Sequence, residues 1–300
     1  SATGNKQYDN MPNNAFGAAG ALTLLARLTP DLQLRDHALR AAERSCWTAL
    51  SRRQGSGLPA YYKGDFWMTV WMGRAFLNLY EATRDSSWLR NTRAYAEILK
   101  KTQQPSGTWT YVDDENLSIG TSNDRDDRTF DNAQHHCAEQ LLFLGRYRAI
   151  TGSEEYLTVE RNAHAWMKSE AARNNYWMDS ASWGILPQTA MPWRDRRGVK
   201  EAQTVETVGP TTYSLYLLDH AQDPEAYALT GKLVAWCEAH AVNWSHPASV
   251  GSGLLPRVSS SIPRGIVNAS ESMRLALVYL KLYAVSKDVT MLAKAKALSA

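Results

Sequence analysis

The chain has 300 residues, of which 44% are hydrophobic and 21% charged, as is typical of a soluble globular protein. Its formal net charge of +3 argues against nucleic acid as the main partner. No apolar run approaches the roughly 18 to 20 residues that a membrane-spanning helix needs, so no membrane span is expected. The first residues do not have the pattern of a signal peptide, so any such peptide has been removed or never existed.

Arginine and cysteine usage gives two further indications. Arg outnumbers Lys by 22 to 11. Because a planar guanidinium group binds carboxylates with two hydrogen bonds, this ratio favours an acidic ligand. The three cysteines, Cys46, Cys137 and Cys237, are far apart and odd in number, so we expect buried small side chains rather than a disulfide framework or a metal site.

Apolar residues recur at helical spacing in ten segments, which short turns join in pairs. The turns lie near residues 29, 84, 152, 223 and 287 and contain Pro, Asp, Ser and Gly, which end helices or begin them. The expected helices cover residues 15–28, 32–50, 65–83, 87–101, 131–150, 154–171, 211–221, 224–241, 270–285 and 288–299. The sequence therefore predicts five helical hairpins.

The two helices of each hairpin differ in character. The first is apolar on most sides, whereas the second carries a charged face. An inner helix buried on all sides and an outer helix half exposed to solvent are what an α/α toroid requires. We therefore expect an all-α protein, a single α/α-toroid domain over residues 1–300 with about five hairpins, and leave open whether the ring is complete.

The connections between hairpins are long and contain many Gly, Pro, Trp and Tyr residues. They cover about residues 52–64, 102–130, 172–210 and 242–269. In a toroid these connections all emerge on one face, which we expect to be the functional face because long loops commonly carry binding residues. The N-termini of the inner helices point to the same face and favour anions.

Aromatic residues of this face are candidate stacking partners for sugar rings. They include Tyr62, Trp67, Trp109, Tyr111, Trp183, Trp193, Tyr213 and Trp244. The competing interpretation is that many of them only pin the long loops to the helices, because large aromatic rings bury area efficiently.

Charged residues of the same face are candidates for chemistry. Asp65 and Asp131 each precede an expected helix and could either cap it or contact substrate. His135 and His136 lie about 100° apart on a helix, so at most one is expected to face the centre of the toroid. Asp113 and Asp114 could hold Ca²⁺ or form a solvated charge run. Arg194, Arg197 and Arg264 are candidate partners for a carboxylate or solvated loop charges.

Two segments resemble a known family. Gly107-Thr108-Trp109, followed by Thr129-Phe130-Asp131-Asn132-Ala133 at the head of a helix, resembles segments of the α/α-toroid pectate lyases of polysaccharide lyase family ten. The resemblance covers about 45 residues of the chain. It implies cleavage of an acidic polysaccharide by β-elimination, with Ca²⁺ on the uronate carboxylate and a basic residue that removes the C5 proton.

A second resemblance competes with the first. Gln103, Gly107 and Trp109 have the spacing of the Q-W repeat of class II terpene cyclases, and residues 124–127 match the D-x-D-D motif of that family. In the terpene cyclases this motif lies in an apolar cavity and donates a proton, whereas here polar residues flank it.

The functional expectation is a secreted or periplasmic carbohydrate-active enzyme, most simply a lyase that cleaves a uronate-containing polysaccharide. Asp113, Asp114 and Asp131 would then serve a cation or substrate hydroxyls, and one histidine would transfer the proton. The first alternative is a glycoside hydrolase that uses two carboxylates. The pool for that pair is Asp65, Asp114, Asp131 and Glu206. A further alternative is a non-catalytic glycan-binding module.

Overall fold

A computed structural model describes residues 12–51, 66–109, 133–171, 178–179, 204–205, 207–221, 223–245, 248–254, 266–267 and 269–299. The chain divides into two compact units. The first unit contains residues 1–104, 109–123 and 147–159, and the second contains residues 105–108, 124–146 and 160–300. Within the described ranges, no helix is both long enough and apolar enough to cross a membrane. The expectation of a single domain stays a prediction.

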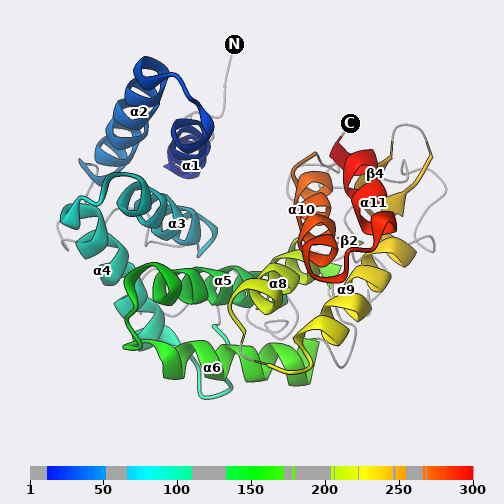
Figure 1. The fold of residues 1–300 in the computed structure, drawn as a ribbon. Coiled ribbons are helices and arrows are strands. Elements are labelled where there is room, and N and C mark those ends of the chain that lie inside the picture. Colours follow the sequence, from blue (N-terminus) through cyan, green and yellow to red (C-terminus); the bar gives the residue numbers. More distant parts are fainter. Residues whose placement is uncertain are drawn as a thin grey trace, which may run out of the picture. The chain divides into compact units, whose positions relative to one another are not determined.

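Ten α-helices lie in the described residues, and they follow the ten segments that the sequence predicts (Figure 1). Their bounds are α1 Pro12–Leu28, α2 Leu32–Ser51, α3 Phe66–Thr83, α4 Ser86–Thr102, α5 Ala133–Thr151, α6 Leu157–Trp166, α8 Val208–Asp219, α9 Ala226–His240, α10 Ala269–Ser286 and α11 Val289–Ser299. After α6 the chain continues as the π-helix η2, Met167–Ala171. The hairpin prediction is therefore confirmed.

The five short turns between paired helices share one capping device. In each turn a side-chain oxygen accepts a hydrogen bond from the backbone N–H two residues later. The five acceptors are Asp31, Asp85, Ser153, Asp223 and Asp288, with N···O distances of 2.8, 2.8, 3.3, 2.8 and 2.9 Å. The bonds to Asp31, Asp85 and Asp288 satisfy N–H groups that the first turns of α2, α4 and α11 leave without an internal partner, and those to Ser153 and Asp223 fix the turns just before α6 and α9. The turns are therefore specified by local sequence.

Three of these turns begin with a residue in the left-handed backbone region. Gly152 has φ of 71°, and Arg84 and Lys287 both have φ of 60°. Such a residue commonly ends a helix, and glycine adopts this conformation without steric cost. Arg84 and Lys287 therefore adopt an unfavourable backbone conformation that packing and capping must offset.

An aromatic cluster forms the core of the first unit. Phe16 from α1 meets Phe76 from α3 edge to face, with ring centroids 5.7 Å apart. The Phe76 ring stacks on Trp88 from α4 at 5.7 Å, and Trp88 lies 4.8 Å from Trp47 of α2. Such ring pairs add to the free energy gained by burying their apolar area. The helices α1, α2, α3 and α4 are joined through this cluster.

The first helix of a hairpin is buried on all sides in some hairpins but not in all. In α8 every residue from Val208 to Leu217 is buried, and in α5 the same holds for residues 137–145. In contrast, α1 and α10 expose apolar side chains. These are Leu24, Leu25 and Leu28 in α1, and Met273, Leu277 and Leu280 in α10. Because α1 packs mainly against α2 and α3, and α10 mainly against α8 and α11, one face of each remains exposed, which corrects the expectation for these two helices.

A small antiparallel sheet, which the sequence analysis did not predict, lies in the second unit. Its strands are β1 Met178–Asp179, β2 Thr204–Val205, β3 Val242–Asn243, β4 Ser249–Leu254 and β5 Ile266–Val267. β4 pairs with β2, β3 and β5, and β1 pairs with β2. The pairing of β2 with β4 places the connection before α8 beside the connection before α10. These two long connections therefore meet, and the functional role of this face stays a prediction.

Candidate functional site

A buried carboxylate joins the N-terminal ends of α8 and α10. Glu271, in the first turn of α10, is 2% exposed. Its Oε2 accepts hydrogen bonds from the backbone N–H of Thr207, at 3.0 Å, and from the Thr207 hydroxyl. Beside it, Ser272 Oγ accepts a hydrogen bond of 3.0 Å from the backbone N–H of Val250 in β4. The negative charge of Glu271 is favourable here because free N–H groups collect at helix N-termini. These contacts fix the chain where α8 and α10 begin.

About one turn farther along these helices, a second polar cluster joins α5, α8 and α10. Arg274 Nη1 donates to Glu139 Oε1 and to Thr212 Oγ1, both at 2.5 Å. The exposed fraction is 15% for the Arg274 side chain and 4% for that of Glu139. Charges so far removed from water are tolerated only when they are paired and hydrogen-bonded. The cluster therefore ties three neighbouring helices together through groups that depend on one another.

The two adjacent histidines lie in the first turn of α5, and their side chains lie outside the described part of the chain. His135 precedes Glu139 by four residues, and His136 precedes Gln140 by four residues. Residues four apart lie on the same face of an α-helix, so position 135 shares the face from which Glu139 reaches α8 and α10. The roles of both histidines stay predictions.

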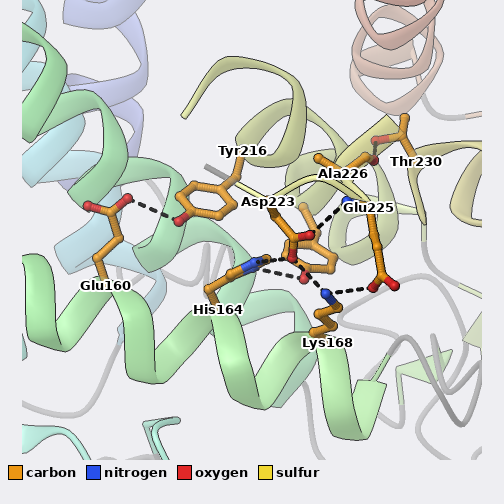
Figure 2. Close-up of polar contacts among 9 residues, drawn as sticks. Glu160, His164, Lys168, Tyr216, Asp223, Glu225, Ala226 and Thr230 are labelled. Atoms are coloured by element: carbon orange, nitrogen blue, oxygen red, sulfur yellow. Dashed lines mark hydrogen bonds and ion pairs between the residues drawn. The ribbon is translucent and has the colours of Figure 1, made fainter. Parts of the chain in front are cut away.

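A third polar cluster surrounds His164 of α6 (Figure 2). Its Nε2 lies 3.0 Å from Asp223 Oδ2, and its Nδ1 lies 3.1 Å from the Tyr213 hydroxyl. Because an ionised carboxylate only accepts hydrogen bonds, Nε2 donates to Asp223. Burial raises the pKa of Tyr213 well above its usual value, so the phenol remains a donor.

Lys168 completes this cluster from η2. Its Nζ donates to Asp223 Oδ2 at 2.8 Å and forms an ion pair of 2.7 Å with Glu225 (Figure 2). Burial alone would raise the pKa of Asp223, but hydrogen bonds from Lys168, the Glu225 backbone and His164 outweigh it and lower this pKa to about 2. The ionisable groups of the cluster satisfy one another, so we interpret it as a structural link between α6 and the turn before α9.

Two of the predicted substrate-binding residues lie in the protein interior. Trp109 is 2% exposed, and its indole N–H donates a 2.9 Å hydrogen bond to the Leu99 carbonyl. Tyr213 is 0% exposed and is hydrogen-bonded to His164. Neither ring offers an open face to a sugar, which corrects the expectation for these two residues. Trp109 instead pins the segment after α4 to the end of that helix, as the competing interpretation required.

The other predicted site residues fall outside the part of the chain whose side chains are described. They are Tyr62, Asp65, Trp67, Tyr111, Asp113, Asp114, Asp131, His135, His136, Trp183, Trp193, Arg194, Arg197, Glu206 and Arg264. Their roles stay predictions. Among the described residues, no group of three or more His, Cys, Asp or Glu side chains could hold a metal ion, and the proposed Ca²⁺ ligands Asp113 and Asp114 lie elsewhere.

The cysteines are unpaired and buried, as expected. Burial raises the pKa of the Cys46 and Cys137 thiols to about 12, so neither is a ready nucleophile.

The sequence did not predict the polar residues that join α5, α8 and α10. Glu139, Thr207, Glu271 and Arg274 were not among the candidates, although all four lie at or within helices of apolar character. The available signal was a charged residue inside an otherwise buried stretch, such as Glu139 between Cys137 and Leu144. A charge in such a position needs a partner, and this requirement points to a neighbouring helix.

No protein-family model matches the chain, and no curated protein sequence matches it. Solved structures do match. A cellobiose 2-epimerase from Bacillus thermoamylovorans aligns with a TM-score of 0.65 and 9% identity, over 96% of this chain and 74% of the epimerase. A GH76 α-mannanase from Bacteroides thetaiotaomicron aligns with a TM-score of 0.58 and 12% identity, over 85% of this chain and 67% of the mannanase.

A third solved structure is a GH76 α-1,6-mannanase from a Salegentibacter species, an inactive variant in complex with α-1,6-mannotriose. It aligns with a TM-score of 0.55 and 12% identity, over 96% of this chain and 70% of the mannanase. Likeness at such low identity concerns the fold alone, and it confirms the predicted α/α toroid. None of these three structures is a pectate lyase.

Proposed function

We propose that this chain is a carbohydrate-active enzyme, and specifically a glycoside hydrolase, with α-1,6-linked mannan as the first substrate to test. The observation that carries the proposal is the similarity in fold, over 96% of the chain, to an α-1,6-mannanase whose structure contains α-1,6-mannotriose. The long connections rich in Trp and Tyr agree with it, because flat aromatic rings suit sugar rings as stacking partners.

Hydrolysis is preferred here to the elimination that the sequence analysis favoured. None of the three solved structures described above is a lyase. Elimination also needs a cationic group to hold the uronate carboxylate. Arg274 of α10 is paired with Glu139 and does not supply this group, so elimination would depend on Arg194, Arg197 or Arg264.

A glycosidase needs two carboxyl groups that flank the scissile bond, one as general acid and the other as nucleophile or base. The buried carboxylates of Glu139 in α5 and Glu271 in α10 do not fit these roles. Glu139 is paired with Arg274, and Glu271 accepts hydrogen bonds from Thr207. The catalytic pair must therefore come from other residues. The pool remains Asp65, Asp114, Asp131 and Glu206, which precede α3, α5, α5 and α8 in the sequence.

A comparison of consecutive aspartates selects Asp114 from this pool and adds its neighbour Asp113. The inactive Salegentibacter mannanase carries asparagine in place of two consecutive aspartates. This chain contains two such pairs, Asp113-Asp114 and Asp126-Asp127. Asp114 belongs both to the pool of candidate carboxylates and to a consecutive pair. We therefore assign the acid and the base to Asp113-Asp114 and keep Asp126-Asp127 as the pair for comparison.

The test compares two double variants on soluble α-1,6-mannan, with new reducing ends as the measure of cleavage. Asp113→Asn/Asp114→Asn should lower the rate by about 10²- to 10⁴-fold, the usual contribution of acid–base groups, and Asp126→Asn/Asp127→Asn should not. Asp85→Asn is the matched control, because asparagine also caps a helix. An unchanged rate in Asp113→Asn/Asp114→Asn would contradict the assignment of the acid and the base. If the parent protein cleaved no neutral polysaccharide at all, the proposed function would be contradicted.

A second candidate is a sugar epimerase, which the TM-score of 0.65 with the cellobiose 2-epimerase favours. An epimerase inverts one carbon by proton transfer and leaves the chain length of its substrate unchanged. Incubation with cellobiose, followed by separation of the resulting disaccharides, distinguishes it from a hydrolase. A non-catalytic glycan-binding module would retain the oligosaccharide and change neither its length nor its configuration.

A further inference from the structure

An exposed tryptophan lies beside an ammonium group and a carboxylate on the second unit. Trp244 directly follows β3 and is 40% exposed. Its ring centroid is 6.2 Å from that of Tyr279 in α10. Lys294 Nζ, from α11, lies 5.6 Å from the Trp244 ring and 5.5 Å from the Tyr279 ring. Aromatic and cation–π contacts thus hold the ring in place while much of its surface remains in water.

Glu238 of α9 organises the polar side of this patch. Its Oε1 accepts hydrogen bonds from the Tyr279 hydroxyl and, at 2.5 Å, from Lys294 Nζ. Burial and the hydrogen bond to Glu238 raise the pKa of Tyr279, so its phenol stays protonated and keeps donating. No described residue donates to Glu238 Oε2 or accepts from the Trp244 indole N–H. The patch therefore offers open aromatic surface, an acceptor and a donor.

We propose that this Trp244 patch, formed by Glu238, Trp244, Tyr279 and Lys294, binds a neutral hexopyranose unit of a glycan. A pyranose presents C–H groups on its face and hydroxyl groups around its rim. The C–H groups suit the negative face of an indole ring, and the hydroxyls suit a carboxylate oxygen and an N–H group. The binding site uses none of the residues assigned to hydrolysis, and the inference does not depend on the proposed function.

The charges of the patch indicate a neutral ligand. Lys294 and Glu238 neutralise each other, with 33% and 27% of their side chains exposed. No net positive charge therefore remains to attract a uronate, and Glu238 would repel its carboxylate. A cationic ligand is disfavoured as well, because Lys294 already occupies the cation site of both rings.

The test is an NMR titration of protein labelled with ¹⁵N in the tryptophan indole group. Trp244→Phe and Trp47→Phe identify the two indole signals. Trp47 is the matched control, because it is 49% exposed and packs on Trp88 in the first unit. The probes are α-1,6-mannotriose and cellobiose as neutral sugars, and trigalacturonate as the anionic comparison. We expect the Trp244 signal to shift and saturate with a neutral sugar, while the Trp47 signal does not move.

Glu238→Gln supplies the second arm, because it keeps the shape of the side chain and removes its charge. Loss of a charge-assisted hydrogen bond, worth about 1.5 to 3 kcal/mol, should weaken the affinity by roughly 10- to 100-fold. Failure of both neutral sugars to shift the Trp244 signal would overturn the inference, as would stronger binding of trigalacturonate or unchanged affinity in Glu238→Gln. The titration measures sugar binding alone, so its result is independent of whether the protein hydrolyses glycans.

Discussion

Breaking the ion pair between Glu139 and Arg274 should destabilise the second unit by several kcal/mol. The two side chains are 4% and 15% exposed, and their closest charged atoms lie 2.5 Å apart. Arg274→Leu removes the guanidinium group that is paired with the buried Glu139 carboxylate. Removing one partner of a buried pair costs about 3 to 5 kcal/mol, because the remaining charge is neither solvated nor paired.

A double-mutant cycle separates this pairing from the loss of packing. Glu139→Leu/Arg274→Leu removes both charges, so its destabilisation should be smaller than the sum of the two single variants by at least about 2 kcal/mol. The control is the pair formed by Arg27 and Glu81 in the first unit, whose side chains are 51% and 23% exposed. Arg27→Leu should cost less than about 1 kcal/mol, because water screens this pair.

The assay is urea unfolding followed by tryptophan fluorescence and far-ultraviolet circular dichroism, with free energies of unfolding extrapolated to water. Strict additivity of the two single substitutions would refute the argument. So would a cost for Arg274→Leu no larger than that for Arg27→Leu, because the two pairs differ chiefly in burial.

Three further predictions concern a turn, the acid response and the histidines. Lys287→Gly should stabilise the protein by about 0.5 to 1 kcal/mol in thermal unfolding, because glycine adopts φ of 60° without steric cost. Arg84→Gly should stabilise it less, because Arg84 also lies over the Tyr80 ring and this contact would be lost. The pKa of Asp223 is lowered to about 2, so its contribution to stability is complete above about pH 4 and is lost as the pH falls toward 2. In melting temperatures measured across that window, Asp223→Asn should show a weaker loss than the parent protein. His135→Ala and His136→Ala should each leave turnover per folded molecule within about tenfold of the parent, because Asp113 and Asp114 are the assigned acid and base, and a loss of about 10²-fold or more in either variant would contradict that assignment.

The helices could be predicted because their signals are local. Apolar spacing and the capping residues Asp31, Asp85 and Asp288 specify each helix and turn from a few neighbouring residues. The strands could not be predicted in this way. β1, β2, β3 and β5 are two residues long, too short for an alternating pattern, and β4 is the Gly- and Ser-rich segment SVGSGL. β1 pairs with β2, and β3 and β5 pair with β4, within one connection each, whereas the pairing of β2 with β4 joins two connections that are distant in sequence.

Site residues were harder to predict than helices because the role of a side chain depends on what lies beside it. Trp109 and Trp244 both lie in long connections, and the sequence favoured Trp109 as the stacking residue because it also belongs to the family-like segments. The structure buries Trp109 against Leu99, whereas Trp244 remains exposed beside Lys294. Similarly, the sequence shows Glu139 as one acidic residue among many, and its role depends on Arg274, which lies 135 residues away in the chain.

Mass spectrometry of the products formed from α-1,6-mannotriose tests the central claim most directly. Hydrolysis adds one water molecule for each bond cleaved, so the masses of the products should sum to that of the substrate plus water. When the reaction is run in ¹⁸O-labelled water, the label should appear at one new end of each cleaved bond, and Asp113→Asn/Asp114→Asn should abolish it. Products of unchanged mass would indicate epimerisation instead. Unlabelled fragments whose masses sum to that of the substrate alone would indicate elimination, and either result would contradict a glycoside hydrolase.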